Sequence, residues 1–349
     1  MRPALDNRKA ISLIDSKDML GAVERLPEFI NSQLENRDHQ TGKIQSKDFH
    51  DIVFLGMGGS ASAADVTLDW LGDKISVPVI VHRDPVIPRF VGSKTLLIAL
   101  SYSGNTRETL VALREASKRG SSLIGIGTGG RLRELSKELR IPFLDVLPAP
   151  APRAALGQMI VACGSALHAC GLIRDPIMEI GQTVKELRGL NYRVRGQTPL
   201  SENPAKRLAF SLKDRMPAVF SFRRIASVAR RFKNQLAENS KMTARYSELP
   251  EAAHNEVEAW HNQHVPFAAV FIRDPYESAF EKSILQSFRS TIKKASGISL
   301  EQVRLNSKTR LGALLSPILY LDYVSVYLAL LRGLDPTDTP WIRYYKDHL

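Results

Sequence analysis

Two short segments carry hydroxyl groups where a phosphate could bind. The segment Ser101-Tyr-Ser-Gly-Asn-Thr106 places three hydroxyls, those of Ser101, Ser103 and Thr106, within six residues, just before an expected helix. Gly104 and Asn105 tolerate a tight turn. Hydroxyls and free backbone N–H groups at a helix N-terminus form an anion site, which the helix dipole strengthens. An ordinary N-cap with turn residues is the structural alternative.

A second segment, Gly56-Met-Gly-Gly-Ser-Ala61, follows an apolar run and precedes another expected helix. With Ser60 at that helix start, the two segments could hold one phosphate from two sides. The same letters also fit the dinucleotide fingerprint G-x-G-x-x-A, and Asp84 lies about where a ribose-binding acid would be. That fingerprint is weak by itself, and a dinucleotide fold has no need of the second hydroxyl cluster.

Alternating short strands and helices surround these segments. In the first half, strands are expected at 51–56, 79–82, 95–100, 123–126 and 143–147, with helices at 60–71, 106–118, 131–139 and 153–170. In the second half, strands are expected at 218–221, 267–272 and 298–305, with helices at 225–238, 276–295 and 310–331. This alternation is typical of parallel sheets covered by helices on both faces.

We expect four regions along the chain. Residues 1–45 read as a helical segment, 46–185 as a first α/β domain, 186–206 as a polar basic linker, and 207–349 as a second α/β domain that ends in a helix and a tail. The two α/β halves are similar in size, which suggests a duplicated architecture.

Composition excludes several classes of protein. The 349 residues are 44% hydrophobic and 24% charged, as in globular proteins, and the net charge of +12 suits anionic ligands. Cys163 and Cys170 are expected to be buried thiols of a cytoplasmic protein. We expect no signal peptide and no membrane span. The basic stretch 223–233 is expected to be a solvated face, with no nucleic-acid-binding signature.

At the two hydroxyl-rich segments, the sequence resembles the sugar isomerase (SIS) domain, in which such loops bind a sugar phosphate. Further segments resemble the bifunctional phosphoglucose/phosphomannose isomerases, chiefly archaeal. These segments are Thr128-Gly-Gly-Arg-Leu132, Ala151-Pro-Arg-Ala-Ala-Leu156, Leu249-Pro-Glu-Ala-Ala-His-Asn255, Leu328-Ala-Leu-Leu-Arg-Gly-Leu-Asp-Pro336 and Thr339-Pro340. Together the motifs run from about residue 51 to residue 346.

The resemblance implies an α/β fold of two SIS-type domains, each a flavodoxin-like three-layer sandwich. It implies a cytoplasmic homodimer that interconverts glucose 6-phosphate and mannose 6-phosphate with fructose 6-phosphate, an activity of glycolysis and gluconeogenesis. No metal or redox cofactor is implied, and no nucleic-acid or membrane partner. The residues expected to hold the phosphate are Gly59, Ser60, Ser101, Ser103 and Thr106.

The resemblance also implies the catalytic groups. Glu238 matches the base that moves the proton between C1 and C2, and Arg153 would stabilise the enediolate. His254, from the neighbouring subunit, and Lys346 would assist ring opening, while Thr339 would leave room for both C2 epimers. Such a set suits aldose–ketose isomerisation, which needs a carboxylate, a cation and a ring-opening acid/base pair.

Taken without the resemblance, each of these residues has an ordinary structural interpretation. Glu238 reads as a surface partner of neighbouring cations, His254 as a neighbour of a helix cap, and Lys346 as part of a frayed tail. The aromatic run 341–345 indicates that the tail packs down. Two departures from the family are Ala253, where some relatives have a second histidine, and Gln235-Leu-Ala237 before the expected base.

Three alternative functions remain open at this point. The chain could isomerise another phosphosugar, such as an amino or pentose sugar. It could sense a sugar phosphate without catalysis, although no DNA-binding domain is attached. It could also be an NAD(P)-dependent oxidoreductase built on Gly56–Ala61, which leaves Ser101–Thr106 unexplained. The histidines show no metal-ligand grouping, so a metal site is not expected.

Overall fold

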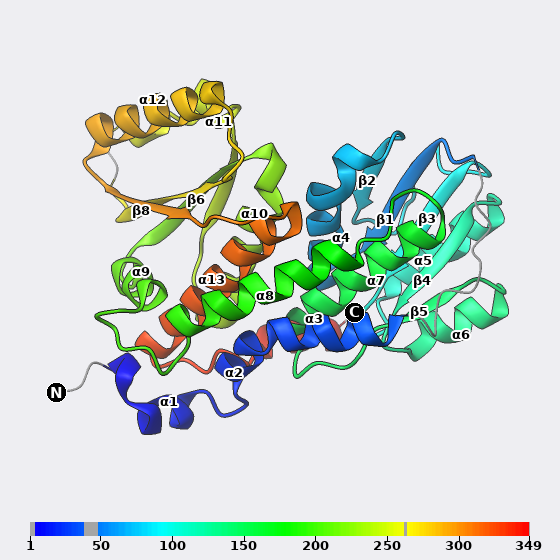
Figure 1. Cartoon of the computed structure of the whole chain (residues 1–349), viewed down its shortest axis with the longest axis horizontal. Helices are drawn as coiled ribbons and strands as arrows, with labels where there is room; N and C mark the ends of the chain where they lie inside the picture. Colours follow the sequence, from blue (N-terminus) through cyan, green and yellow to red (C-terminus); the bar gives the residue numbers. More distant parts are fainter. Residues whose placement is uncertain (1–3, 38–47, 262–263, 349) are drawn as a thin grey trace. The chain divides into compact units, whose positions relative to one another are not determined.

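The computed structural model describes residues 4–37, 48–261 and 264–348. The chain divides into two compact units (Figure 1). One boundary falls between residues 24 and 25, and the other falls between residues 185 and 186, within helix α8 (Ile177–Val194). We call residues 25–185 the five-stranded unit, and residues 1–24 together with 186–349 the four-stranded unit.

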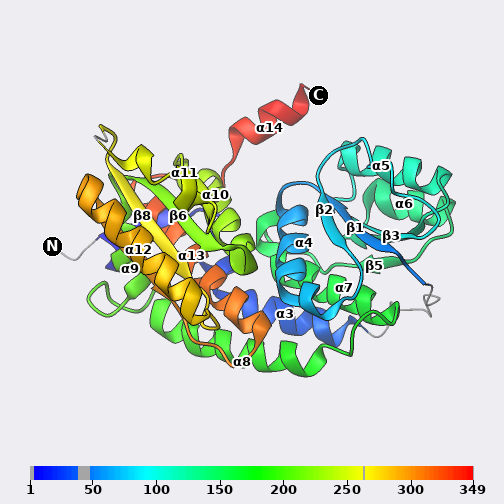
Figure 2. The same ribbon diagram turned by 90° about the horizontal axis from the view of Figure 1, so that it is seen from above.

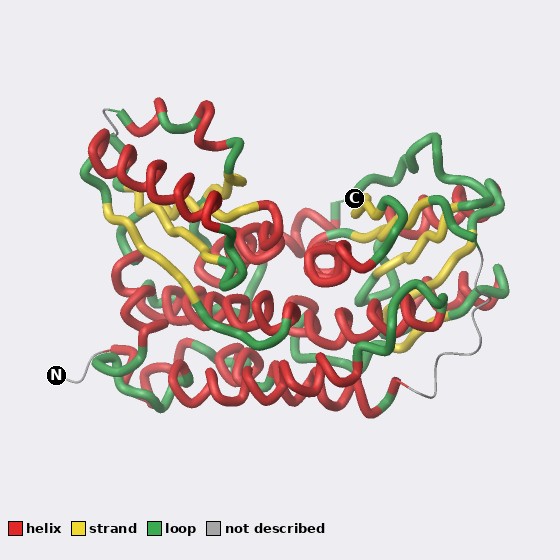
Figure 3. The backbone as a smooth tube through the Cα atoms, turned by 45° about the horizontal axis from the view of Figure 1, so that its top comes forward, coloured by secondary structure: helices red, strands yellow, loops and turns green. Residues whose placement is uncertain are grey.

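The five-stranded unit is a parallel sheet between two layers of helices (Figure 3). Its strands are β1 (Asp51–Gly56), β2 (Val79–His82), β3 (Thr95–Leu100), β4 (Ser122–Gly127) and β5 (Phe143–Asp145), in the order β2-β1-β3-β4-β5. Its helices are α3 (Leu26–Glu35), α4 (Gly58–Leu71), α5 (Arg107–Lys118), α6 (Gly130–Glu138) and α7 (Leu156–Ala169), with short 3₁₀ turns η3 (Gly72–Lys74) and η4 (Pro152–Ala155). This strand order is that of flavodoxin-like folds.

Side-chain periodicity explains the layers of this unit. Helices α5 and α6 bury apolar residues against one face of the sheet, where they pack on Val53, Leu55, Leu97 and Ala99. Helices α4 and α7 cover the other face, and α3 packs on α7. All six residues of β3 are buried, as expected for a central strand of a parallel sheet that is covered on both sides.

The four-stranded unit repeats the same winding with one strand fewer. Its strands are β6 (Met216–Phe222), β7 (Arg245–Leu249), β8 (Phe267–Arg273) and β9 (Ser299–Arg304), all parallel, in the order β7-β6-β8-β9. Its longer helices are α1 (Arg8–Ile14), α9 (Pro204–Leu212), α10 (Ala226–Ser240), α12 (Ala279–Ser296), α13 (Arg310–Leu331) and α14 (Pro340–Asp347). Shorter ones are η1 (Ala4–Asp6), α2 (Met19–Glu24), η5 (Arg223–Ile225), α11 (Ala252–Asn255) and η6 (Glu258–Trp260).

Helix α13 lies at the centre of the four-stranded unit. It packs against α9, α10 and α2, so it is buried on nearly every side, which explains why it is apolar all round. By length and composition alone it could also cross a membrane, but almost all of its side chains are buried inside the unit. The expected two-domain α/β fold is confirmed, and the expected limits of α13 agree with the structure.

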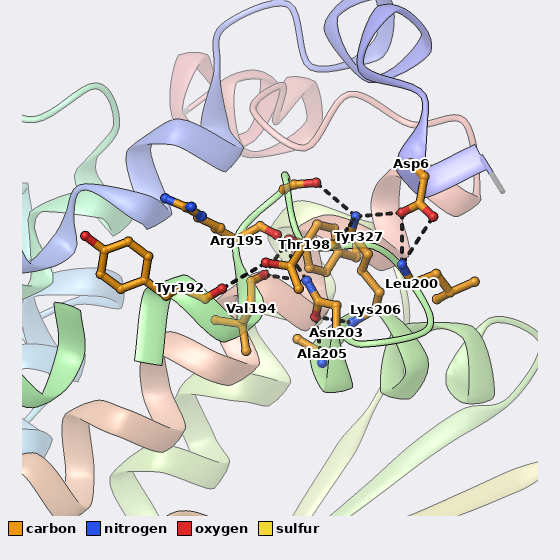
Figure 4. Close-up of polar contacts among 11 residues, drawn as sticks. Asp6, Tyr192, Val194, Arg195, Thr198, Leu200, Asn203, Ala205, Lys206 and Tyr327 are labelled. Carbon is orange, nitrogen blue, oxygen red and sulfur yellow. Dashed lines mark hydrogen bonds and ion pairs between the residues drawn. The ribbon is translucent and has the colours of Figure 1, made fainter. Parts of the chain in front are cut away.

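The segment expected as a linker, 186–206, is structured throughout. Its first half is the end of α8, and its second half is anchored by Lys206, whose side chain is fully buried (Figure 4). The Lys206 ammonium donates to the Asp6 carboxylate at 2.9 Å and to the carbonyls of Gly196 and Thr198 at 2.9 and 2.8 Å. This network ties the segment to the chain's N-terminus.

The expected N-terminal segment also differs from the structure. Residues 4–24 belong to the four-stranded unit and residues 25–37 to the five-stranded unit, while the expected boundary at residue 45 lies outside the described residues. Strand β7 was not expected from the sequence, since this edge strand is polar and half exposed. Cys163 and Cys170 are buried free thiols, as expected.

Candidate functional site

The two hydroxyl-rich loops begin side by side in the five-stranded unit. Strands β1 and β3 pair in parallel with Gly56 opposite Leu100, so the loops that follow them leave the same edge of the sheet together. In the strand order of this sheet, the chain winds in opposite directions from this pair. Such a switch point is where open α/β sheets bind their ligands.

Hydroxyl groups of the β3–α5 loop are held in a network. The Ser101 and Thr106 hydroxyls lie 2.8 Å apart, and the backbone N–H of Thr106 donates to Ser101 Oγ at 3.4 Å. Ser103 Oγ accepts the backbone N–H of Asn105 at 3.2 Å, and its side chain is exposed. Ser101 is buried, so it shapes the loop from behind while Ser103 faces the solvent.

Gly104 lets this loop pass close to its neighbour. Its φ is +70°, and a Cβ at this position would lie 1.8 Å from the carbonyl oxygen of Gly129. From the first turn of α6, Leu132 donates its N–H to the Gly104 carbonyl at 2.8 Å, and Arg131 donates its N–H to Asn105 Oδ1 at 3.1 Å. The segment 128–132 therefore braces the hydroxyl loop.

Tyr102 joins the two loops to a third segment. Its backbone N–H donates to Ser60 Oγ at 3.1 Å, and its phenol donates to the Ala149 carbonyl at 3.0 Å and accepts the Ala149 N–H at 2.8 Å. Sequence reasoning did not single out Tyr102, because a tyrosine between two serines gives no signal of such bridging.

Arg153 lies next to the first loop. It is in η4 and is 7% exposed, and a Cβ on Gly59 would lie 3.8 Å from the Arg153 Cα and 3.7 Å from the Pro152 carbonyl oxygen. These are ordinary van der Waals distances, so the start of α4 lies directly against this backbone. The five-stranded unit thus brings Gly59, Ser60 and Arg153 together.

The N-termini of α4 and α5 face this switch point. Within the described residues, the N-cap side chains of these helices, Met57 and Thr106, accept no hydrogen bond from the N–H groups of the first turn. Helix starts of this kind present N–H groups and a positive dipole end to an anion. Asp84, the acid expected for a dinucleotide site, accepts the N–H of Val86 at 2.8 Å in a local turn.

Glu238 lies in the last turn of α10 in the four-stranded unit, half buried. The residues after it fix this helix end, since Asn239 donates to the Ser325 hydroxyl at 2.8 Å and Ser240 to the Ser325 carbonyl at 2.7 Å. Lys241, with φ of +52°, donates to the Glu238 carbonyl at 3.1 Å and to the Asp335 carbonyl at 2.6 Å. The position of Glu238 is therefore set by contacts to α13 and to the segment that follows it.

The basic stretch at the start of α10 is only partly a solvated face. Arg231 is buried and makes an ion pair with Asp322 of α13, with distances of 2.6 and 3.2 Å. Arg230 donates to the Tyr246 hydroxyl at 2.8 Å, whereas Arg223 is largely exposed. The expectation was wrong for Arg231, because its side chain points to the buried helix α13.

His254 and Glu238 lie at opposite ends of the four-stranded sheet. Helix α10 carries the chain from the carboxyl end of β6 back to the amino end of β7, and Glu238 is near its end. His254 follows the carboxyl end of β7 in α11 and is exposed. A helix of 15 residues is about 22 Å long, so one chain does not bring these two side chains together.

Thr339 and Lys346 both belong to α14, where Thr339 is the N-cap residue. This helix projects from the rest of the four-stranded unit (Figure 2), and its side chains are exposed, Trp341 to 78% and Tyr345 to 62%. The expectation that the aromatic tail packs down is wrong for the single chain. The aromatic side chains contact one another along the helix, as Trp341 and Tyr344 do, and do not enter the core.

In the four-stranded sheet, the loops after β6 and β8 correspond to the loops after β1 and β3, but they are built differently. After β8, Ser278 caps α12 with its own side chain in a capping box with Glu281. Arg310 donates to the Asp274 carboxylate at 2.7 Å and to the Arg224 carbonyl, so it bridges the loops that follow β8 and β6. No three-hydroxyl loop like 101–106 follows these strands in the sequence. Among the described residues, no group of His, Cys, Asp and Glu side chains could hold a metal ion.

Comparisons with known proteins match both units. Residues 46–138 match the model of the SIS domain, and residues 201–349 match that of the bacterial phospho-glucose isomerase C-terminal SIS domain. The chain is 34% identical over 335 residues to a bifunctional phosphoglucose/phosphomannose isomerase of Caldicellulosiruptor bescii, which covers 95% of this chain and 98% of that protein. A bifunctional phosphoglucose/phosphomannose isomerase of Aquifex aeolicus is 31% identical to the chain, over 85% of this chain and 90% of that protein.

One relative is named for a different activity. A D-glucosamine-6-phosphate 4-epimerase of Sulfolobus acidocaldarius is 28% identical to the chain and covers 84% of it and 94% of that protein. Among solved structures, a glucose-6-phosphate isomerase like protein of Thermus thermophilus is 20% identical, with a TM-score of 0.62 and 99% of both chains covered. The C-terminal domain of glucosamine-fructose-6-phosphate aminotransferase from Francisella tularensis gives a TM-score of 0.69 at 17% identity, with 92% and 97% covered. These two structures share the fold.

Proposed function

Because the chain belongs to the bifunctional phosphoglucose/phosphomannose isomerase family of SIS-domain phosphosugar isomerases, we propose that it interconverts glucose 6-phosphate and mannose 6-phosphate with fructose 6-phosphate. The observation that carries this proposal is the pair of uncapped helix starts and hydroxyl loops at the β1–β3 switch point. That arrangement suits the phosphate of a sugar 6-phosphate.

In the proposed mechanism, the five-stranded unit holds the phosphate and stabilises charge. Ser60, Ser103 and Thr106 would donate to the phosphate oxygens, together with backbone N–H groups of α4 and α5. Arg153, which lies beside Gly59, would be close to the reacting carbons of a sugar bound there. A fixed guanidinium stabilises the oxygen that becomes negative in the enediolate.

Glu238 would be the general base. It would take the proton from C2 of the aldose as the carbonyl at C1 becomes an enediolate oxygen, and return that proton to C1. The hydroxyl proton of O2 passes to O1 in the same interconversion, which leaves the carbonyl at C2 of the ketose. Isomerisation in this direction conserves all atoms and electrons, so it requires no redox partner. The end of α10, which is fixed by hydrogen bonds to α13, would hold the Glu238 carboxylate in place between the two proton transfers.

Ring opening would require His254 and Lys346, and the geometry supports a homodimer for this step. Glu238 and His254 lie at opposite ends of one sheet, so a site containing both would take His254 from a second copy. The exposure of His254 and of α14 leaves both accessible to a partner chain. We propose a cytoplasmic, metal-independent homodimer in which each site is shared.

The activity is tested by a coupled assay of the purified chain with each aldose phosphate in the presence of EDTA. Fructose 6-phosphate formed from both substrates supports the proposal. Glu238→Gln should remove turnover and leave phosphate affinity intact, while the exposed control Glu202→Gln should keep full activity. Turnover that survives in Glu238→Gln would show that another group is the base.

Sharing of the site between subunits has a separate test. Glu238→Gln and His254→Ala should each be inactive as homodimers. When the two inactive proteins are unfolded together and refolded, mixed dimers should regain activity, because each contains one site with both native groups. If refolded mixtures remain inactive although dimers form, His254 acts within its own chain or has no role.

A second candidate is conversion of an amino sugar phosphate, favoured by the similarity to the D-glucosamine-6-phosphate 4-epimerase. The phosphate loops would serve either substrate, so they do not separate the two. Incubation with glucosamine 6-phosphate, followed by chromatographic separation of its epimers, distinguishes them. An epimer formed while neither glucose 6-phosphate nor mannose 6-phosphate is isomerised would favour this candidate.

A further inference from the structure

A second candidate binding site lies along α12 in the four-stranded unit, and its lining includes none of the residues assigned above. A groove of about 710 Å³ runs between α12 and the edge strand β9. Its lining includes four cationic side chains, those of Arg273, Lys282, Arg289 and Lys293, and it includes no carboxylate. The volume is within the range of ligand sites in proteins, about 300–1,000 Å³.

Helical spacing places these cations in one row. Lys282, Gln286, Arg289 and Lys293 follow one another at intervals of four, three and four residues, so they share one face of α12. The row covers about 16 Å at 1.5 Å per residue. Lys282 and Lys293 are exposed, and Arg289 is half buried. Like charges arranged in this way repel one another and favour an anionic ligand.

The arginines of the groove are held in place. Arg273 is paired with Glu277. The guanidinium groups of Arg273 and Arg289 both donate to the amide oxygen of Gln302, at 3.1 and 2.5 Å respectively. The Arg289 guanidinium also lies over the Phe271 ring, 5.4 Å from its centroid. Nε of Arg289 is buried and has no partner among the described residues, which leaves a donor unsatisfied in the groove wall.

The two nearby acids contact groups outside this row. Glu277 is occupied by Arg273, and Glu281 accepts the backbone N–H of Ser278 in the capping box. The floor of the groove is apolar, formed by Leu285, Ile298 and Leu300, which pack on the core of the unit. A ligand that fits both parts has several negative charges and one flat or apolar portion.

We propose that this groove binds a nucleoside polyphosphate, with the phosphates along Lys282, Arg289 and Lys293 and the base on the apolar floor. The groove is on the face of the sheet that α12 covers, whereas Glu238 is on α10, which packs with α13 on the other face. It lies at the β9 edge, whereas His254 follows β7 at the opposite edge. Within this unit, the groove is therefore separate from Glu238 and His254.

The test is calorimetric titration of the full-length protein with ATP in EDTA, so that the polyphosphate keeps its charge. Lys293→Glu should weaken ATP binding about tenfold or more, the equivalent of one lost charge-assisted contact. The matched control is Lys294→Glu, which makes the same charge change on the adjacent residue, outside the groove lining. It should weaken binding less than about twofold.

Two further titrations test whether ATP binds in this groove or at the sugar phosphate site, and whether its base contributes to binding. Saturating fructose 6-phosphate should leave ATP binding unchanged, and tripolyphosphate should bind more weakly than ATP because it lacks the base. The proposal is overturned if ATP does not bind at millimolar concentration, if the two lysine variants weaken binding equally, or if fructose 6-phosphate displaces ATP. Equal binding of ATP and tripolyphosphate would overturn the assignment of the base to the groove floor. None of these outcomes depends on whether the protein is an active isomerase.

Discussion

The backbone N–H of Tyr102 donates to the hydroxyl of Ser60, so the β3–α5 loop is fastened to the first turn of α4. The two residues are 42 positions apart, and the bond connects the start of α4 with the hydroxyl loop before α5, both of which we assign to phosphate binding. Ser60 therefore has two roles, since it supports the neighbouring loop and presents a hydroxyl near the anion site.

Substitutions of the loop serines should separate these roles. Ser60→Ala should raise KM about tenfold or more and also lower the free energy of unfolding by about 1 kcal/mol, because the Tyr102 N–H loses its acceptor. Ser103→Ala should raise KM with little change in stability, since its side chain is exposed. Steady-state kinetics and urea unfolding check both effects. Ser62→Ala, which removes a hydroxyl that donates to the Gly58 carbonyl within α4, is the control, and an unchanged KM for Ser103→Ala would contradict its assignment.

Gly104→Ala should destabilise the fold more than an alanine substitution at other glycines of positive φ does. A Cβ there meets the Gly129 carbonyl at 1.8 Å, so the loop must move as well as adopt a strained φ. We expect a loss of about 3 kcal/mol or more, compared with about 1–2 kcal/mol for the φ penalty alone. Gly120→Ala is the matched control, because its φ is +76° but a Cβ there would make only an ordinary contact, 3.9 Å from the Ser93 Cβ. Denaturant unfolding measures both, and equal losses would show that the contact with Gly129 does not matter.

Removing one member of the buried Arg231–Asp322 pair should lower the free energy of unfolding more than replacing both members with apolar residues. Asp322→Leu leaves a buried guanidinium without its carboxylate and should cost about 3–5 kcal/mol, as should Arg231→Met. The double variant should recover much of that loss, because neither charge then remains unpaired. Thermal and urea unfolding of the three variants test this. If the two single losses simply add in the double variant, the pair is not energetically coupled.

Both cysteines should be unreactive in the folded protein. Burial raises the pKa of the Cys163 thiol to about 12 and that of Cys170 to about 11. At pH 8 the folded thiols should stay protonated and resist a thiol reagent, whereas the unfolded chain should react at both. Since the unfolded thiols ionise first as the pH rises above about 9, stability should fall from about pH 9 until the folded thiols also ionise, near pH 11 for Cys170 and near pH 12 for Cys163. Rapid modification of the native protein at pH 8 would show that these sites open readily.

Thr339 should affect the choice between the two aldose phosphates if the proposed function is correct. A larger residue at this N-cap position, as in Thr339→Gln, should lower kcat/KM for mannose 6-phosphate more than for glucose 6-phosphate, because the C2 hydroxyl of mannose points the other way. Competition between the two substrates measures the ratio directly. Thr337→Gln, two residues earlier in the same segment, serves as the comparison. Equal losses for both substrates would count against a role of Thr339 in epimer selection.

Local patterns in the sequence were sufficient for most of the fold. Apolar runs that end in glycine or polar turns marked β1, β2 and β3 at their observed limits, and helical spacing marked α13. Periodicity failed where an element depends on its neighbours. Strand β7 is polar because it lies at an edge, and 186–206 is polar because its charged groups, such as Lys206, find partners inside the fold.

By itself, the sequence determined the chemistry available to this protein: hydroxyls and glycines after two strands, an arginine that follows a proline-rich bend, and a glutamate near a helix end. Only the tertiary structure decided which of these groups are neighbours. Strand pairing puts Gly56 beside Leu100, and packing puts Gly59 beside Arg153, whereas the direction of α10 separates Glu238 from His254. The reason is physical: propensity and turn chemistry act within a few residues, but strand register and buried ion pairs such as Lys206–Asp6 join residues 200 positions apart.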